Sequence, residues 1–155
     1  MFFRQERGGL GGRTFSIWKF RTMLPTDGFG GWTQRDDKRI TPLGAFLRRT
    51  SLDELPQLFN VMAGEMSLVG PRPHASAMDA EYGAAIGEYL LRMRVRPGIT
   101  GLAQVSDLRG SVDGVEAMRR RVHADVDYID NWSIGLDLKI LAKTIPHLLG
   151  SSNAY

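Results

Sequence analysis

Residues 47–58 have the sequence LRRTSLDELPQL and carry the most informative side chains of the chain. They set two adjacent carboxylates, Asp53 and Glu54, shortly after a pair of arginines. A second basic stretch, GEMSLVGPRP, follows at residues 64–73. Guanidinium groups match the oxygens of phosphate, so two acids and several arginines in one short region suit a phosphate ester. Phosphoryl chemistry is therefore the leading hypothesis.

The residues around the carboxylates predict two short helices. Thr41–Pro42 is a good N-cap and first-turn pair, which predicts a helix ending at about Arg49. Ser51 and Glu54 fit the capping box S-x-x-E, which predicts a second helix. Pro56 lacks an N–H that this helix needs, so the helix must kink or begin later. Helical spacing places Leu43, Phe46 and Leu47 on one face of the first helix and points Leu55, Leu58, Phe59 and Met62 inward from the second.

The rest of the chain completes an α+β pattern. Residues 2–5 and 14–23 are rich in aromatic and β-branched residues on either side of a glycine turn, which predicts a β-hairpin. Residues 24–39 are typical of a long loop that could close over a site. Further helices are expected at residues 75–93, 115–129 and 134–149, with a loop at 95–101 and a short extended piece at 102–105. We therefore expect residues 1–155 to form a single globular α+β domain, mainly helical with a short N-terminal hairpin.

Composition narrows the possible chemistry. Cysteine is absent, which excludes a disulfide framework, a thiolate zinc site and a cysteine nucleophile. The 20 Lys and Arg against 17 Asp and Glu give a charge of +3, which favours anionic partners without requiring a nucleic acid. No apolar run approaches the roughly 20 residues that span a bilayer, so the chain as given is expected to be soluble. Its abrupt, strand-like beginning at residues 1–7 suggests that an upstream segment is missing.

Each charged group has a structural as well as a functional interpretation. Asp53 and Glu54 could complement a helix dipole and close the capping box. Alternatively, one could act as a nucleophile or base while the other holds a divalent cation. Arg48 and Arg72 could be solvated, or they could grip phosphate oxygens. In an extended segment Arg92, Arg94 and Arg96 would share a face that meets a phosphate or an acidic membrane surface.

Other groups have a simpler expected role. Residues 119–121 are three arginines expected on a solvated helix face. His74, His123 and His147 are too far apart in sequence for metal-ligand spacing, so a zinc site is not expected. The glycine run at residues 8–12 does not open a helix after a strand, which favours a hairpin turn over a nucleotide-binding loop.

Taken together, the motifs resemble the catalytic domain of the bacterial sugar transferases, the monotopic polyprenyl-phosphate hexose-1-phosphate transferases. The resemblance runs from residue 3 to about residue 149. Five motifs in order carry it, at residues 19–23, 47–57, 64–73, 96–101 with Gln104, and 127–139. Members of this family have a membrane-dipping helix just upstream of residues 2–5. The resemblance therefore implies a catalytic domain without its membrane helix.

The resemblance implies an undecaprenyl-phosphate sugar phosphotransferase. Such an enzyme moves a sugar 1-phosphate from a UDP-sugar to undecaprenyl phosphate and releases UMP, at the cytoplasmic face of the bacterial inner membrane. By the same resemblance, Asp53 attacks the β-phosphorus to form an acyl-phosphate sugar intermediate, and Glu54 holds Mg²⁺ against the diphosphate. The implied substrate-binding residues are Lys19, Arg21, Arg48, Arg72 and Gln104.

The residues near the C-terminus resemble the exopolysaccharide-priming branch, whose usual donors are UDP-glucose or UDP-galactose. Two rival functions stay open. A truncated, non-catalytic domain would bind a UDP-sugar or a partner protein without turnover, and an Asp53→Asn variant separates this from catalysis. A nucleic-acid-binding module is suggested by the arginine clusters alone, and the paired acids beside Arg48 argue against it.

Overall fold

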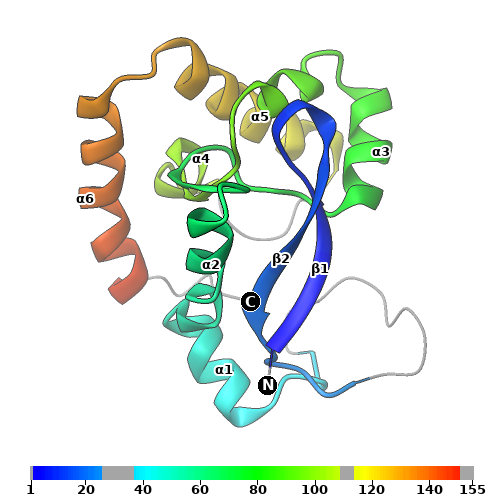
Figure 1. The fold of residues 1–155 in the computed structure, drawn as a ribbon, viewed down its shortest axis with the longest axis vertical. Helices are drawn as coiled ribbons and strands as arrows, with labels where there is room; N and C mark the ends of the chain where they lie inside the picture. The colour runs from blue at the N-terminus through cyan, green and yellow to red at the C-terminus, as the bar shows by residue number, and fades with distance from the viewer. Residues whose placement is uncertain (1, 26–36, 109–113, 151–155) are drawn as a thin grey trace.

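The computed structural model describes residues 2–25, 37–108 and 114–150 (Figure 1). Residues 26–36 of the expected long loop lie outside this part of the chain. The strands are β1 (Phe2–Gly8), β2 (Thr14–Phe20), β3 (Ser67–Val69) and β4 (Gly98–Thr100). The helices are α1 (Pro42–Arg49), α2 (Gln57–Met62), α3 (Ser76–Ala85), α4 (Leu102–Val105), α5 (Val115–Asp130) and α6 (Ile134–Gly150). The predicted α+β class is confirmed.

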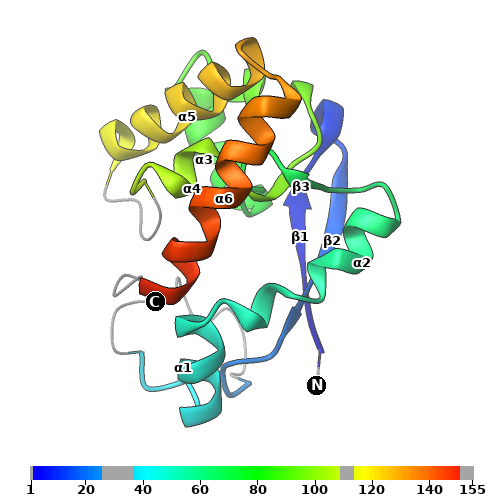
Figure 2. The same ribbon diagram turned by 90° about the vertical axis from the view of Figure 1, so that its left-hand side faces the viewer.

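The predicted N-terminal hairpin is confirmed, with strands at Phe2–Gly8 and Thr14–Phe20 instead of residues 2–5 and 14–23. β1 and β2 pair antiparallel with Phe2 opposite Phe20 and Gly8 opposite Thr14. The turn between them contains Gly11 and Gly12 at positive φ, a conformation that glycine adopts without steric cost. In Figure 2 the hairpin stands in the right half of the molecule, with α5 on the left, α6 in front between them and α1 at the lower end. The hairpin thus forms one wall of the fold.

The parallel strands β3 and β4 meet through glycines. The Gly70 N–H donates to the Thr100 carbonyl at 2.9 Å, and the Gly98 N–H donates to the Pro71 carbonyl at 2.9 Å. A Cβ atom on Gly98 would lie 2.1 Å from the Gly70 nitrogen, and one on Gly101 would lie 2.1 Å from the Gly70 oxygen. Glycine is therefore required for the backbones of the two motifs to touch.

This contact corrects two expectations. Residues 98–100 were expected to lie in a loop, but they form β4 because they pair with a strand far away in sequence. Residues 102–105 were expected to be extended, and they form the short helix α4. Local periodicity over four residues cannot distinguish these states.

The predicted helices are confirmed with different boundaries. Thr41 caps α1, because its hydroxyl oxygen accepts a hydrogen bond from the Gly44 N–H at 3.0 Å. The helix expected at residues 75–93 is interrupted, because Ile86 has extended backbone angles and a 3₁₀ helix follows at Tyr89–Arg94. α5 and α6 correspond to the two helices expected near the C-terminus.

Two apolar clusters form the core, and α5 contributes to both. The first contains Tyr82, Ile86, Tyr89, Met118 and Val122. The second contains Val69, Val105, Tyr128 and Ile140. The core therefore lies between α3, the 3₁₀ helix, the short parallel strands and the two long helices, away from α1 and α2.

The inward face predicted for α2 is wrong. Leu55, Leu58, Phe59 and Met62 are 50%, 43%, 58% and 83% exposed. The buried residues of α2 are Gln57 and Asn60, which are 1% and 0% exposed. Leu43 and Phe46 of α1 are also exposed. α1 and α2 thus present their large apolar side chains on the surface.

Two expectations about arginines also need correction. Arg92 is 5% exposed and lies in the 3₁₀ helix, so it does not share the face of an extended segment with Arg94 and Arg96. Arg121 is 8% exposed and donates from Nε to the Leu108 carbonyl at 3.0 Å. Both guanidinium groups lie in polar surroundings inside the fold, where hydrogen bonds compensate their burial.

None of the helices in the described parts of the chain combines the length and the apolar character needed to cross a membrane.

We expect Gly98→Ala to destabilise the fold by about 1–3 kcal/mol, because the added methyl group overlaps backbone atoms that cannot rotate away. Urea denaturation followed by circular dichroism measures this loss. Gly87→Ala is the matched control, since a Cβ at Gly87 meets no heavy atom within 4 Å. Equal stability of the two variants would show that the contact between β3 and β4 tolerates a side chain.

Candidate active site

The two adjacent carboxylates lie in a tight turn between α1 and α2. Ser51 has a left-handed backbone with φ of 55°, and a 3₁₀ turn follows at Leu52–Glu54. The side chain of Ser51 makes no capping hydrogen bond, so the predicted capping box is wrong. Pro56 occupies the N-cap position of α2, so the helix begins after the proline, as one of the two predicted alternatives required.

Glu54 is buried and paired with two cations. Its Oε1 accepts from Lys19 Nζ at 2.8 Å and from Arg72 Nη2 at 2.5 Å. Its Oε2 accepts from Arg72 Nη1 at 3.2 Å. Lys19 comes from β2, Arg72 from the segment after β3, and Glu54 from the turn before α2. We call these three residues the ion trio. They join three segments that are distant in sequence.

The charges in the ion trio fix the protonation state of Glu54. Burial alone would raise the pKa of Glu54, but the positive charges of Arg72 and Lys19 and their hydrogen bonds hold it well below the usual range. Burial lowers the pKa of Lys19, and Glu54 partly opposes that shift. One buried carboxylate thus neutralises only one of two adjacent cations. The trio has a net positive charge that can attract an anion.

Asp53 lies in a different environment although it is the next residue. It is partly exposed, whereas Glu54 is buried. Burial and the negative charge of Glu54 raise the pKa of Asp53, while Lys19, Arg48 and Arg72 act in the opposite direction. A carboxylate with a raised pKa is more basic and hence a better nucleophile. Asp53 is therefore the carboxylate of the pair that solvent can reach.

The other predicted site residues lie outside the ion trio. Arg48, on α1, donates to Thr22 Oγ1 at 2.9 Å and to the sulfur of Met23 at 3.2 Å, and its charge acts on Asp53. Arg21 is exposed, with its guanidinium 5.8 Å from the ring centre of Phe3.

Gln104 lies in α4. It is 7% exposed and donates to the Ile99 carbonyl at 3.4 Å. Among the described contacts, neither Arg21 nor Gln104 bonds to Asp53 or Glu54.

Sequence reasoning missed Asn60, which docks α2 onto the hairpin. Its Oδ1 accepts from the Trp18 N–H at 3.0 Å, and its Nδ2 donates to the Ser16 carbonyl at 2.8 Å and to Glu65 at 2.7 Å. These bonds satisfy backbone groups at the edge of β2 that faces no other strand in the described part of the chain. They also fix the distance between Lys19 on β2 and the carboxylate turn. A polar residue among apolar ones at positions 58–62 was the available signal.

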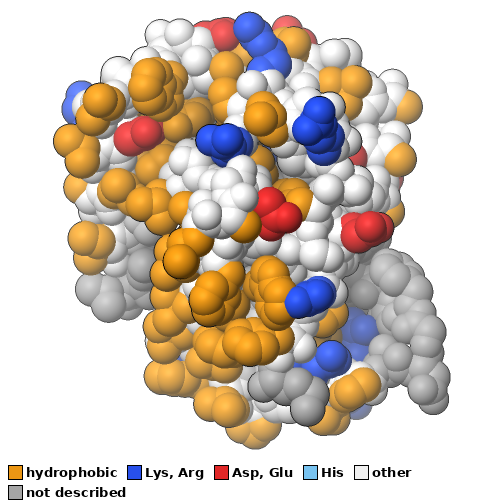
Figure 3. Space-filling view, viewed as in Figure 1, with side chains coloured by type: hydrophobic (Ala, Val, Ile, Leu, Met, Phe, Trp, Pro, Cys, Tyr) orange, Lys and Arg blue, Asp and Glu red, His pale blue; other side chains and the backbone are white. Residues whose placement is uncertain are grey.

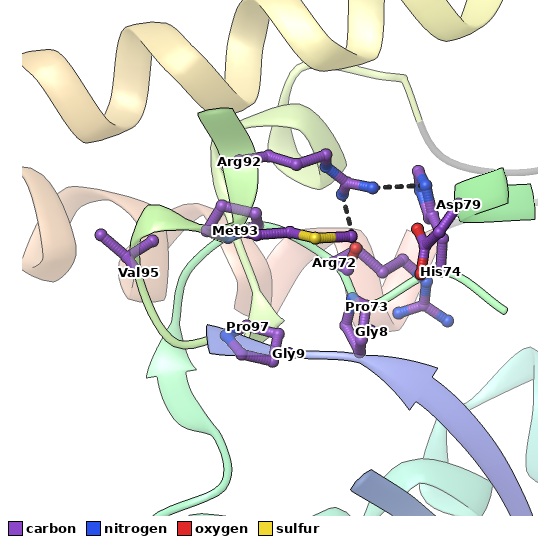
Figure 4. Close-up of a pocket in the computed structure, with 11 residues that line it drawn as sticks. Gly8, Gly9, Arg72, Pro73, His74, Asp79, Arg92, Met93, Val95 and Pro97 are labelled. Carbon is purple, nitrogen blue, oxygen red and sulfur yellow. Dashed lines mark hydrogen bonds between the residues drawn. The ribbon is translucent and has the colours of Figure 1, made fainter. Parts of the chain in front are cut away.

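A buried polar network behind Arg72 was also missed. Arg92 donates to Asp125 on α5. It also donates to the nitrogen Nδ1 of His74 and to the backbone carbonyl of Arg72 (Figure 4). Burial and the charge of Arg92 keep the pKa of His74 well below its usual range, so His74 is neutral and can accept this bond. Tyr89 donates to Asp79 at 2.7 Å at the edge of the same network.

Glu54 is the carboxylate of the pair that could hold a magnesium ion together with a phosphate substrate. No group of three or more His, Asp or Glu side chains able to hold a metal occurs in the described residues. Mg²⁺ in phosphate sites needs only one or two carboxylates, because phosphates and water supply its other ligands. Oε2 of Glu54 accepts one described bond, so it keeps acceptor capacity for a hard cation.

The comparison with known proteins agrees with this geometry. A profile described as bacterial sugar transferase matches residues 1–151. The chain belongs to the bacterial sugar transferase family. The match covers all of the described residues of the site, from Lys19 to Gln104.

Relatives of this family member carry more specific names. The chain is 57% identical over 155 residues to a UDP-glucose:undecaprenyl-phosphate glucose-1-phosphate transferase of Caulobacter vibrioides, and the alignment covers 99% of this chain and 58% of the relative. It is 49% identical over 158 residues to a protein of the same name from Xanthomonas campestris pv. campestris, covering 100% of this chain and 33% of the relative. It is 44% identical over 151 residues to the exopolysaccharide production protein PSS of Rhizobium leguminosarum bv. phaseoli, covering 94% of this chain and 76% of the relative. The chain thus spans a third to somewhat more than half of the first two relatives.

We expect Arg72→Gln to raise the pKa of Glu54. The pKa of Glu54 in the folded protein lies below 4.5, the ordinary value for glutamate that applies in the unfolded chain. The charged carboxylate therefore contributes stability that is fully present above pH 4.5 and is lost as the pH falls through the folded-state pKa. In the variant this loss begins at a higher pH. Carboxyl ¹³C NMR titration in metal-free buffer, with urea denaturation across the same pH range, measures both effects.

Arg4→Gln is the control for this prediction, because Arg4 is exposed and lies over the ring of Trp18. An unchanged Glu54 titration in Arg72→Gln would contradict the electrostatic account of the ion trio.

Proposed function

We propose that the chain transfers glucose 1-phosphate from UDP-glucose to undecaprenyl phosphate, releases UMP, and thereby primes exopolysaccharide synthesis. Family membership and the names of the Caulobacter and Xanthomonas relatives support the reaction and the sugar. The name of the Rhizobium relative supports the exopolysaccharide role. The observation that carries the proposal is the partly exposed carboxylate of Asp53 beside the positively charged ion trio.

The proposed reaction has two displacements at one phosphorus atom. In the first, an oxygen of Asp53 bonds to the β-phosphorus of the UDP-sugar, and the bond from that phosphorus to the bridging oxygen breaks, so that UMP leaves with the bridging oxygen. The product is an acyl phosphate that joins Asp53 to the sugar. In the second, a phosphate oxygen of undecaprenyl phosphate attacks the same phosphorus. The Asp53 carboxylate is then regenerated as the leaving group.

The residues around Asp53 suit this chemistry. A carboxylate approaches an anionic diphosphate only when positive charge offsets the repulsion. Arg72 and Lys19 supply such charge on one side, and Arg48 acts on Asp53 from α1. In this proposal Glu54 holds both cations of the trio in place and is the protein ligand of Mg²⁺. When bound, Mg²⁺ would neutralise part of the diphosphate charge.

The proposal also places the carboxylates at the cytoplasmic face of the bacterial inner membrane. The acceptor is a lipid, so the site must lie near a bilayer surface. Large apolar side chains gather over α1 and α2 (Figure 3), on both sides of the turn that carries Asp53. The exposed members of this apolar surface are Leu43, Phe46, Leu52, Leu55, Leu58, Phe59 and Met62. A surface of this kind can rest in the interfacial region of a membrane without spanning it.

We expect Asp53→Asn to lower the rate of UMP release by at least about a thousandfold, because the amide cannot displace UMP. The assay contains UDP-glucose, undecaprenyl phosphate in detergent and Mg²⁺, and a parallel titration measures binding of UDP-glucose, which is expected to persist. Asp130→Asn is the matched control on the exposed end of α5. Undiminished UMP release by Asp53→Asn would rule out the covalent mechanism. Binding of UDP-glucose without release by the unchanged chain would favour the non-catalytic alternative.

We expect a Phe59→Ser, Met62→Ser variant to bind vesicles at least about tenfold more weakly, since it removes two apolar side chains from the proposed membrane contact. Co-sedimentation with vesicles of phosphatidylethanolamine and phosphatidylglycerol measures the partitioning. Leu10→Ser is the control, because Leu10 is 44% exposed in the turn of the hairpin, away from α1 and α2. Equal partitioning of both variants would place the membrane contact elsewhere.

A further inference from the structure

The segment that carries Arg72 has few ways to be held in place. Pro71 and Pro73 flank Arg72, and neither has a backbone N–H to donate. Its carbonyl groups are therefore the main backbone groups through which the rest of the fold can fix it. The structure shows three consecutive carbonyls, those of Arg72, Pro73 and His74, each accepting a hydrogen bond from another part of the chain.

The donors come from two sides. Arg92 Nη2, in the 3₁₀ helix, donates to the Arg72 carbonyl at 2.5 Å. Arg7 Nη1, on β1, donates to the Pro73 carbonyl at 3.3 Å. The Gly8 N–H, next along β1, donates to the His74 carbonyl at 3.3 Å. The Pro-Arg-Pro segment is thus clamped between the hairpin and the 3₁₀ helix.

Arg92 is itself held rigidly. It is 5% exposed, and Asp125 on α5 is 1% exposed. Arg92 donates from Nε to Asp125 Oδ2 at 3.0 Å, its Nη2 lies 2.8 Å from the same oxygen in an ion pair, and it also donates to His74. A buried guanidinium that bonds a carboxylate and a carbonyl through a planar fork has one favourable orientation. Its position is therefore transmitted to the Arg72 backbone.

We propose that Arg92, held by Asp125, is a positioning residue that fixes the backbone at Arg72 and so keeps the Arg72 guanidinium on Glu54. Arg92 bonds the backbone of Arg72, while the Arg72 side chain reaches Oε1 and Oε2 of Glu54 on its other side. Arg92 therefore acts through Arg72. This inference rests on the proposed function, since it assigns Arg92 to the same phosphate-handling site.

A double-mutant cycle tests this coupling. Lys in place of Arg92 keeps the charge but loses the fork, so it cannot bond Asp125 and the Arg72 carbonyl together. We expect Arg92→Lys to lower kcat/KM for UMP release at least tenfold in the unchanged chain and less than twofold in the Arg72→Gln background. Similar losses in both backgrounds would overturn the proposal, because a residue with a general structural role acts independently of Arg72.

A spectroscopic measurement separates this proposal from the proposed function. The bidentate pair with Glu54 restricts rotation of the Arg72 guanidinium, so its two Nη groups give distinct ¹⁵N NMR signals. We expect these signals to merge in Arg92→Lys and to stay separate in Arg120→Lys, the matched control on the exposed face of α5. If the unchanged chain releases no UMP but this difference occurs, the positioning role holds and the proposed function fails. Unchanged signals in a folded Arg92→Lys would overturn the positioning role.

Arg7→Met provides a second route if Arg92→Lys does not fold. This variant removes the bond to the Pro73 carbonyl from the hairpin side and leaves the pair of Arg92 and Asp125 in place. We expect a smaller loss of kcat/KM, about threefold, that again disappears in the Arg72→Gln background. A loss that persists unchanged in that background would contradict the clamp from this side as well.

Discussion

The bidentate contact between Arg72 and Glu54 is the interaction on which the other features of the site depend. It buries a carboxylate, and a buried carboxylate is tolerated only when it is paired and hydrogen-bonded. Removing one partner of such a pair typically costs about 3–5 kcal/mol, so the positions of the turn before α2 and of the segment after β3 are strongly coupled. Lys19 extends this coupling to β2, and Asn60 holds α2 against the same strand. The glycine contact between β3 and β4 then sets where the segment of Arg72 begins.

The same contact explains how two neighbouring acids differ. Glu54 is turned inward and its pKa is held low by Arg72 and Lys19, whereas Asp53 is partly exposed and its pKa is raised by burial and by the charge of Glu54. Two adjacent carboxylates in one 3₁₀ turn cannot both occupy the buried position, so one is stabilised as an anion and the other is left more basic. The difference in environment, rather than the residue type, separates a buried, ion-paired acid from a partly exposed, more basic one.

Local signals in the sequence were sufficient for the hairpin and for α1. The glycines between two stretches rich in β-forming residues predicted the hairpin, and Thr41 followed by Pro42 predicted the start of α1. Features that depend on contacts between distant residues were not accessible. β4 exists because it pairs with β3, and Arg92 is buried because Asp125, on α5, neutralises it. The resemblance to known enzymes drew attention to Lys19, Glu54 and Arg72, but their mutual contacts required the fold.

The reversed orientation of α2 follows from the site it supports. Its inner side must face the hairpin edge and the charged turn, so that side carries Gln57 and Asn60, and the apolar residues of the helix point outward. An amphipathic pattern identifies two faces of a helix but does not say which of them is covered by protein. In most globular proteins the apolar face is covered, because water is the only alternative. If the acceptor is a lipid, as we propose, a bilayer is a further alternative, and the buried polar face and the exposed apolar face of α2 would both follow from one requirement, that the Asp53 carboxylate lie at a membrane surface.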